Sequence, residues 1–466
     1  MGQFDRPIQR QSSLQSVLAV PLLPRPPSRR RCTPMTPPMQ RASTKVGRLS
    51  KLEAIFNMCN IIVGSGILAL PYAMSLTGGV LGTILLVVVS AGSTLSGLMV
   101  GWCLELCEDE FMAKGVPRHL RDFSAIAATA FGPLGRIVMQ IICLLQLWFC
   151  SEAFLIFLGW NMHCILPVSQ EGAIVIAGIA AFALDYVPEH SFAYVSLIGF
   201  AAAALSLIAL LAAGMSLPEQ DMLFWENHDS VKWDGAFEAT GIILFSTSSH
   251  SGLPAVYTRM RNPEADFSPA CSAAFALCTL AHAAAAMIGW YFYGNYISQS
   301  FTENIGFDLG MQNRLPATLI LRWMTCAAFC IKIQAALPLA MRPVLVTIQS
   351  FLGIDNVQVR KSPPYFVEDQ TMSRTRLMQC RFASKIVLTG FSVLMALYFE
   401  EQLGFVLAIT GCFFGMVVAI IFPFAAYLAL VGREAGLLTW LGLGSCTLMG
   451  IAFAVIGTYG EVMKLF

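Results

Sequence analysis

Two short segments carry the residue types best suited to hold a small charged solute. Residues 60–74 read NIIVGSGILALPYAM, and residues 245–254 read FSTSSHSGLP. Each is an apolar stretch that glycine and small hydroxyl side chains interrupt just before a proline. Proline alone kinks helices, but a kink does not explain why Gly, Ser and Thr cluster ahead of both prolines. The pattern therefore predicts two helices that unwind at a binding site.

The two interruptions offer opposite partial charges. Unwinding the first segment frees backbone N–H groups, which suit a carboxylate; the residues concerned are Gly64, Ser65 and Gly66. The second segment supplies carbonyls and hydroxyls, which suit an ammonium, from Phe245, Ser246, Thr247 and Ser248. A site with both halves fits an amino acid zwitterion.

The composition places these segments in a membrane. The 466 residues are 56% hydrophobic and only 12% charged, about half the charged fraction of a soluble protein. Apolar runs long enough to cross a bilayer recur from residue 52 onward. Within a bilayer, irregular backbone survives only where it is buried in protein or lines a cavity. We find no phosphate-binding loop, metal cluster or nucleophile–base pair, so we expect no enzyme, cofactor, metal or nucleic-acid partner.

The chain divides into a tail and a transmembrane domain. Residues 1–50, rich in Pro, Ser and Arg, predict a disordered basic tail; its composition also resembles a cleaved transit peptide, which the internal prolines disfavour. Residues 51–466 predict an all-α polytopic domain of about eleven spans. The approximate limits are 52–75, 78–104, 136–162, 171–187, 190–214, 235–258, 268–294, 314–345, 381–399, 404–431 and 434–459.

Basic residues indicate the orientation. With the N-terminus in the cytoplasm, 24 of the 29 Lys and Arg residues lie on the cytoplasmic side, a strong positive-inside signal. The two interrupted helices, the first and the sixth, then run in opposite directions five spans apart. That is the arrangement of an inverted five-plus-five repeat.

The sequence also resembles a known family. FNMCNIIVGSGILALPYAMSLTGGVLG is similar to the first helix of the amino acid/auxin permease family, GIILFSTSSHSGLPAVYTRMRNPEADFSP to its sixth helix, and LGFVLAITGCFFGMVVAIIFP to its tenth. FSTSS, LP and RMRNP look most like the vesicular inhibitory amino acid transporter and vacuolar amino acid transporters. The resemblance implies the amino acid–polyamine–organocation fold, with helices 1 and 6 broken, and secondary transport of amino acids.

Lys332 and Asn60 are the candidates for ion coupling. A lysine inside a span, as in FCIKIQAALPLAM, is costly to bury and therefore indicates a functional site. In the resembled superfamily, an ammonium near helices 1 and 8 can replace a sodium ion, so Lys332 favours protons over sodium as the coupling ion. The resemblance gives Asn60 a role in cation binding; a buried amide bonded to nearby backbone explains it equally well.

Four further residues complete the candidate set. Glu152 needs a proton or a cation inside its span; its depth matches that of Arg322, so we predict an ion pair, the alternative being proton exchange with Lys332. His250 at the second interruption is either a proton carrier or a local cap. Thr410 is a candidate pocket residue on the tenth span, although packing is the favoured role.

The sequence thus predicts a secondary active transporter for small neutral or a broad range of amino acids, coupled to protons, working by alternating access. The alternatives are sodium coupling and a non-transporting amino acid sensor. The expected location is a vacuolar, vesicular or plasma membrane.

Overall fold

The computed structural model describes residues 47–187, 193–218, 228–354 and 374–464. The predicted tail, residues 1–50, therefore lies almost wholly outside the described residues. The described chain is helical apart from turns, loops and two isolated β-bridges. This confirms the all-α class.

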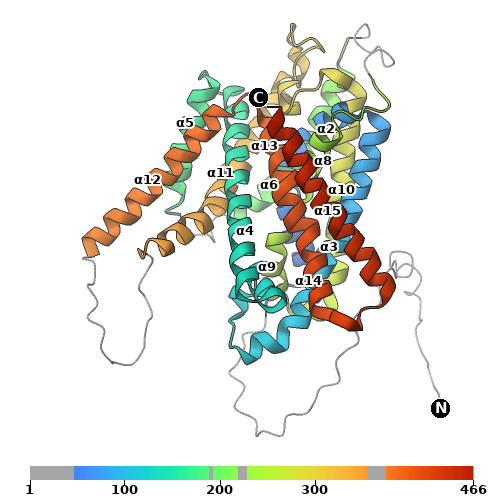
Figure 1. The fold of residues 1–466 in the computed structure, drawn as a ribbon. Helices are drawn as coiled ribbons and strands as arrows, with labels where there is room; N and C mark the ends of the chain where they lie inside the picture. Colours follow the sequence, from blue (N-terminus) through green and yellow to red (C-terminus); the bar gives the residue numbers. More distant parts are fainter. Residues whose placement is uncertain (1–46, 188–192, 219–227, 355–373, 465–466) are drawn as a thin grey trace, which may run out of the picture.

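Most helices stand side by side in one bundle, while α12 runs obliquely away from it (Figure 1). We call the end where Leu49 and Arg259 lie the inner end, and the end where Gly78 and Glu238 lie the outer end. Seven described helices are long and apolar enough to cross a membrane, and a bent pair makes an eighth span. The remaining three expected spans correspond to two shorter apolar helices, α5 and α6, and to the interrupted pair α8–α9.

Each predicted span corresponds to a helix or an interrupted pair of helices, although α3, α4, α11 and α12 extend six or more residues beyond the predicted limits. The first half of the bundle comprises α1 (Lys51–Ile62), the 3-10 turn η1 (Ser65–Ala69), α2 (Leu70–Thr77), α3 (Gly79–Ala113), η2 (Arg118–Leu120), α4 (Phe123–His163), α5 (Gln170–Leu184) and α6 (Ala193–Met215). The second half comprises α8 (Ala236–Thr247), η5 (His250–Gly252), α9 (Leu253–Arg259), α10 (Pro263–Tyr293), η6 (Gly294–Tyr296), η7 (Phe301–Glu303), α11 (Pro316–Phe351), α12 (Arg374–Tyr398), α13 (Leu403–Ile409), the π-helical turns η8 (Thr410–Gly415) and η9 (Val417–Ile421), α14 (Phe422–Val431), η10 (Gly432–Glu434) and α15 (Leu437–Met463).

The long helix α4 contains one break. Gly132 has φ 75° and ψ −166°, a left-handed conformation that favours glycine, and Pro133 follows it. The break separates the stretch before residue 132 from the span itself. It lies where the sequence predicted the third span to begin.

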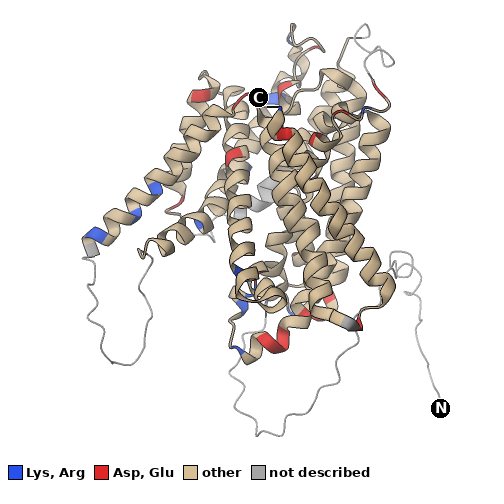
Figure 2. Ribbon diagram, in the orientation of Figure 1, with Lys and Arg blue, Asp and Glu red and all other residues tan. Residues whose placement is uncertain are grey.

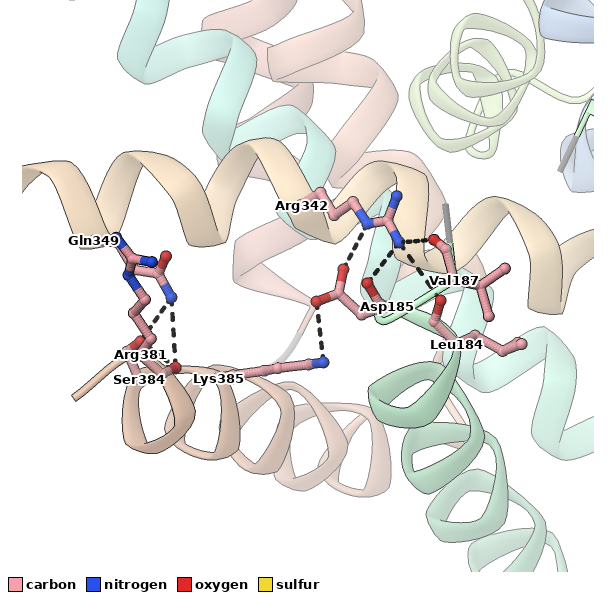
Figure 3. Close-up of polar contacts among 8 residues, drawn as sticks. All are labelled: Leu184, Asp185, Val187, Arg342, Gln349, Arg381, Ser384 and Lys385. Carbon is pink, nitrogen blue, oxygen red and sulfur yellow. Dashed lines mark hydrogen bonds and ion pairs between the residues drawn. The ribbon is translucent and has the colours of Figure 1, made fainter. Parts of the chain in front are cut away.

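Charged residues lie mostly toward the two ends of the bundle (Figure 2), as a bilayer-spanning protein requires. At the inner end, Asp185 joins three helices (Figure 3). Its carboxylate accepts from Arg342 Nε on α11 at 2.7 Å and pairs with Lys385 Nζ on α12 at 3.0 Å. Arg342 also donates to the backbone carbonyls of Leu184 and Val187 at the end of α5. This cluster fixes α5, α11 and α12 to one another.

A short tie lies at the inner end of the two interrupted helices. Leu49 N donates to Arg259 O at 2.9 Å, and Arg261 N donates to Leu49 O at 3.0 Å. Arg261 Nε adds a bond to Arg48 O at 2.8 Å. A Cβ on Gly47 would lie 2.2 Å from Met260 O, so only glycine permits this approach. The segment before α1 is thereby bonded to the segment after α9.

Candidate functional site

The first interruption begins where α1 ends. Val63 leaves the helix at φ −77°, ψ 80°, and Gly64 is extended at φ −91°, ψ −160° before η1 starts. Pro71 in the first turn of α2 cannot donate a backbone hydrogen bond, which suits the start of a helix. The two parts are bent by 49°. The predicted break at Gly64-Ser65-Gly66 is confirmed as a feature of the fold.

The second interruption is the counterpart of the first. α8 ends at Thr247, Ser248 departs from helical geometry at φ −82°, ψ 67°, and Pro254 lies in the first turn of α9. At the end of α8, Leu244 O accepts from Ser248 N and Thr247 O from Ser249 N. The carbonyls of Phe245 and Ser246 lie beyond the last helical bond, as the first N–H groups of η1 lie before the first one. They therefore present the opposite partial charges that the sequence predicted.

The two interruptions lie against each other. A Cβ placed on Gly66 would come within 2.5 Å of Ser246 Oγ and 2.8 Å of Ser246 Cα. A Cβ on Gly64 would meet nothing within 4 Å. Gly66 is therefore a packing position between η1 and α8, whereas Gly64 faces open space.

That open space is a cavity of about 610 Å³, within the range of about 300–1,000 Å³ typical of small-molecule sites. Its walls come from α1, η1, α4, α8, α9 and α11. Among the predicted residues it is lined by Gly64, Ser65, Gly66, Phe245, Ser246 and Ser248. A smaller cavity of about 220 Å³ shares Gly64 and Ser65 with it and adds Asn60 and Lys332.

Lys332 lies beside the first break. From α11, its Nζ donates to the carbonyl of Val63, the first residue past α1. The break leaves this carbonyl outside the helical ladder and at the negative end of the α1 dipole. Lys332 Nζ therefore supplies a hydrogen-bond donor to a carbonyl that the helical ladder leaves without one.

Three predicted residues face elsewhere. His250 is fully buried, and its Nε2 lies 2.9 Å from both Ser93 O and Ser96 Oγ on α3. Thr247 donates from Oγ1 to Ile243 O, and Thr410 donates to Val406 O. None of the three lines the cavity. His250 is thus bonded to α3 and does not cap its own interruption. Thr247 and Thr410 do not line this cavity, and the packing role fits Thr410.

The predicted ion pair between Glu152 and Arg322 is also wrong for the described residues. Both carboxylate oxygens of Glu152 are buried without a hydrogen-bond partner there. Arg322 instead donates to Cys164 Sγ at 3.1 Å and lies 4.6 Å from the Phe307 ring centroid. Equal depth in two helices does not establish that the side chains face each other, and the arginine extends toward the outer end.

Gln146 on α4 is one of several polar cavity residues that the sequence did not predict; the others include Asn57, Ser249, Ser251 and Arg259. The Gln146 side chain is 4% exposed and its Nε2 donates to Ser248 Oγ at 3.1 Å. Its position within a span was the available signal, because a buried amide in a membrane is costly unless it has a role.

The outer end is closed over the site. Tyr72 Oη on α2 donates to Glu238 Oε1 on α8 at 3.1 Å, and Lys464 Nζ pairs with Glu238 Oε2 at 2.8 Å. Gly404 N donates to Gln299 Oε1 at 2.8 Å. The cavity lining instead reaches the inner end, where it includes Arg259. Among the described residues, the cavity lining thus extends to the inner end, while these hydrogen bonds join the helices at the outer end.

Comparison with known proteins gives concordant results. The family model described as transmembrane amino acid transporter protein matches residues 47–463. Amino acid transporter AVT1C of Arabidopsis thaliana is 25% identical over 89% of this chain and 69% of its own length. Amino acid transporter AVT1J of the same plant is 24% identical over 90% and 92%.

The fold is similar to that of solved transporters. MhsT in complex with L-phenylalanine superimposes with a TM-score of 0.57 at 10% identity, over 90% of this chain and all of its own. The inward-facing conformation of Mhp1 gives 0.55 at 13% identity, over 90% and 92%. At these identities the likeness concerns the fold alone, and it confirms the predicted polytopic transporter architecture.

Proposed function

This chain belongs to the transmembrane amino acid transporter family, and from that premise we propose that it carries small neutral or a broad range of amino acids by proton-coupled alternating access. It is an integral, multi-pass membrane transporter of amino acids rather than an enzyme. The proposal concerns the substrate range, the coupling ion and the conformational cycle. The contact between the two helix interruptions in one cavity carries it.

The interruptions provide one half-site for each end of a zwitterion. The substrate carboxylate binds the N–H groups that begin η1, at Ser65 and Gly66, where the helix dipole favours an anion. The ammonium binds the carbonyls that end α8, at Phe245 and Ser246. Contact between Gly66 and Ser246 keeps the half-sites close enough for one small molecule to bridge them.

Lys332 supports protons as the coupling ion. Its ammonium neutralises the Val63 carbonyl while it is charged. Loss of its proton leaves that carbonyl without a cation and disfavours the broken conformation of α1. Because Lys332 and Gly64 line the same small cavity, protonation and substrate occupancy act on the same stretch of backbone.

The one-sided opening supports alternating access. The site opens at the inner end while the Tyr72–Glu238 and Gln299–Gly404 bonds close the outer end. Rocking one group of helices against the others around a fixed central site reverses this arrangement. Basic residues support a cytoplasmic inner end, in a vacuolar, vesicular or plasma membrane.

Uptake into liposomes tests the function. The purified full-length chain is reconstituted, and labelled amino acids are supplied under an imposed proton gradient, an imposed sodium gradient or neither. We expect saturable uptake that a proton gradient drives without sodium. Uptake that requires sodium at a constant proton gradient contradicts proton coupling. Saturable binding without flux under every gradient supports the sensor and contradicts transport.

A further inference from the structure

Two cysteines and an arginine meet at the outer end, away from the cavity. Cys164 directly follows the last residue of α4, and Cys326 lies on α11. The Cys326 thiol is hydrogen-bonded to the Cys164 sulfur. Arg322 precedes Cys326 by four residues, a spacing that places both on one face of α11, and its guanidinium donates to Cys164 Sγ at 3.1 Å. Two donors on α11 therefore converge on one sulfur at the end of α4.

These contacts favour the reactive form of Cys164. While it carries its proton, it donates to Trp160 O at 3.1 Å. The hydrogen bond from Cys326 and the charge of Arg322 hold the pKa of the Cys164 thiol below its usual range, although burial opposes them. The neighbouring His163 acts in the same direction as Arg322. The thiolate is the nucleophile in disulfide exchange, so Cys164 is the thiol prepared to react.

The two cysteines differ in their access to a reagent. Cys164 is half-buried, whereas Cys326 is buried. A reagent from the solvent therefore meets Cys164 first, and Cys326 stands behind it. In the proposed orientation the outer end is the non-cytoplasmic end, and disulfides form mainly outside the cytosol.

We propose that Cys164 and Cys326 form a redox-active dithiol, which a small disulfide molecule converts to an intramolecular disulfide. The Cys164 thiolate attacks one sulfur of the reagent and releases its other half as a thiolate. Cys326 then loses its proton and attacks the Cys164 sulfur of the mixed disulfide, which releases the second half. The cysteines lose two electrons, their two protons pass through water to the released thiolates, and the reagent is reduced to two thiols.

The reaction changes which group Arg322 neutralises. Its guanidinium lies 4.6 Å from the Phe307 ring centroid, on the loop that also carries Glu303. Burial raises the pKa of the Glu303 carboxyl most, a Cys164 thiolate raises it further, and Arg322 lowers it. A disulfide removes the thiolate and leaves Arg322 to act on Glu303 alone. The oxidised protein should therefore have a lower Glu303 pKa and a firmer attachment of this loop to α11.

Oxidised glutathione is the probe for the dithiol. Purified full-length protein is incubated with it, remaining thiols are blocked with N-ethylmaleimide, and peptides are analysed by mass spectrometry without reduction. We expect a peptide linked through Cys164 and Cys326. Cys164→Ser and Cys326→Ser should each abolish the link. Cys330→Ser is the matched control, because Cys330 is a half-buried thiol one turn further along α11, and it should retain the link.

Arg322→Gln tests the role of the guanidinium. The rate at which Cys164 reacts should fall by about tenfold, the effect of about one pKa unit on the fraction of thiolate. An unchanged rate contradicts activation by Arg322. If the variant does not fold, the pH dependence of the wild-type rate replaces it: a midpoint at about 8.5, the usual thiol pKa, contradicts the activation.

Thermal unfolding measures the effect on Glu303. Between pH 4.5 and pH 8 the oxidised protein should lose less stability than the reduced protein, because a lower Glu303 pKa narrows the range over which stability falls. An unchanged slope contradicts the connection to Glu303. Recovery of Cys164 and Cys326 as blocked thiols, or of Cys164 joined to glutathione without a link to Cys326, overturns the dithiol.

Discussion

At the scale of single residues, the side chains of this transporter fall into those that face the cavity and those that hold its walls. Lys332 reaches the broken end of α1, whereas His250 bonds to α3. Both are polar groups inside spans, so their burial alone does not distinguish their roles. Their roles differ because the Lys332 side chain points to the first interruption, whereas the His250 side chain points to a neighbouring helix.

Lys332→Ala should uncouple transport from protons. Without the ammonium, the Val63 carbonyl loses its cation in every state, so titration of this position no longer changes the α1 break. We expect the pH dependence of uptake to flatten while the protein still reaches the membrane. Uptake measured from pH 5 to pH 8, alongside Lys332→Arg, checks this. A normal profile in Lys332→Ala assigns the lysine a structural role.

Glu303 gives the outer end its own pH dependence. Burial raises the pKa of the Glu303 carboxyl from 4.5 to about 7, although the Arg322 guanidinium opposes the shift. Folding therefore favours the protonated form, and the free energy of unfolding falls as the pH rises from about 4.5 to about 7. Above about pH 7, Glu303 causes no further fall in the free energy of unfolding.

Glu303→Gln should remove this dependence. Thermal unfolding of the purified protein between pH 4.5 and pH 8 is the measurement, and the variant should lose much less stability than the wild type over that range. Glu401→Gln removes an exposed carboxylate at the same end and serves as the control. A wild-type slope in Glu303→Gln contradicts the assignment.

At the scale of helices, glycines decide which elements can touch. The two glycines of the first interruption have different tasks, because Gly66 meets Ser246 while Gly64 faces the cavity. Elsewhere, a Cβ on Gly411 would lie 1.7 Å from Gly241 O, so η8 and α8 are in backbone contact. Small residues allow such approaches in membrane helices.

Gly64→Ala and Gly66→Ala should therefore differ. In Gly66→Ala the added methyl pushes α8 away, and overpacking of this kind costs about 1–3 kcal/mol. In Gly64→Ala the extended backbone accepts alanine and the methyl enters the cavity, so substrate affinity falls while stability holds. Thermal unfolding measures the loss of stability in each variant, and binding titration measures the loss of substrate affinity. Equal loss of stability in the two contradicts the placement of Gly64.

The sequence was sufficient for features that depend on composition along the chain. Both interruptions and the eleven spans follow from apolar runs and from Gly, Ser and Pro placed within them. Partners across helices were not predictable, because they depend on the rotation of each helix about its axis. Glu152 and Arg322 lie at similar depths, but their side chains point in different directions. The orientation of each helix likewise directs Thr247 and Thr410 away from the cavity and Gln146 toward it.

At the scale of the whole molecule, the two ends of the described bundle differ. Hydrogen bonds from α2, α8 and α13 close the outer end, while Arg259 and Ala255 of α9 border the inner mouth. Ala255 is exposed although it lies within the bundle. An aqueous path to the site from the inner end explains that exposure.

Ala255→Cys should react with a membrane-impermeant thiol reagent from the inner face. The rate should fall when an amino acid substrate promotes closure, and Gly404→Cys, on the closed outer side, should not react from the inner face. Labelling in right-side-out and inside-out vesicles gives the side. Reaction of Ala255→Cys from the opposite face reverses the proposed orientation.

The tie between Leu49 and Arg259 has a mechanical consequence. Because three hydrogen bonds join the start of α1 to the end of α9, we expect the two inner half-helices to move together. A movement that opens the inner end should then displace both. Substitutions that remove these hydrogen bonds should therefore change the rate at which the inner end opens.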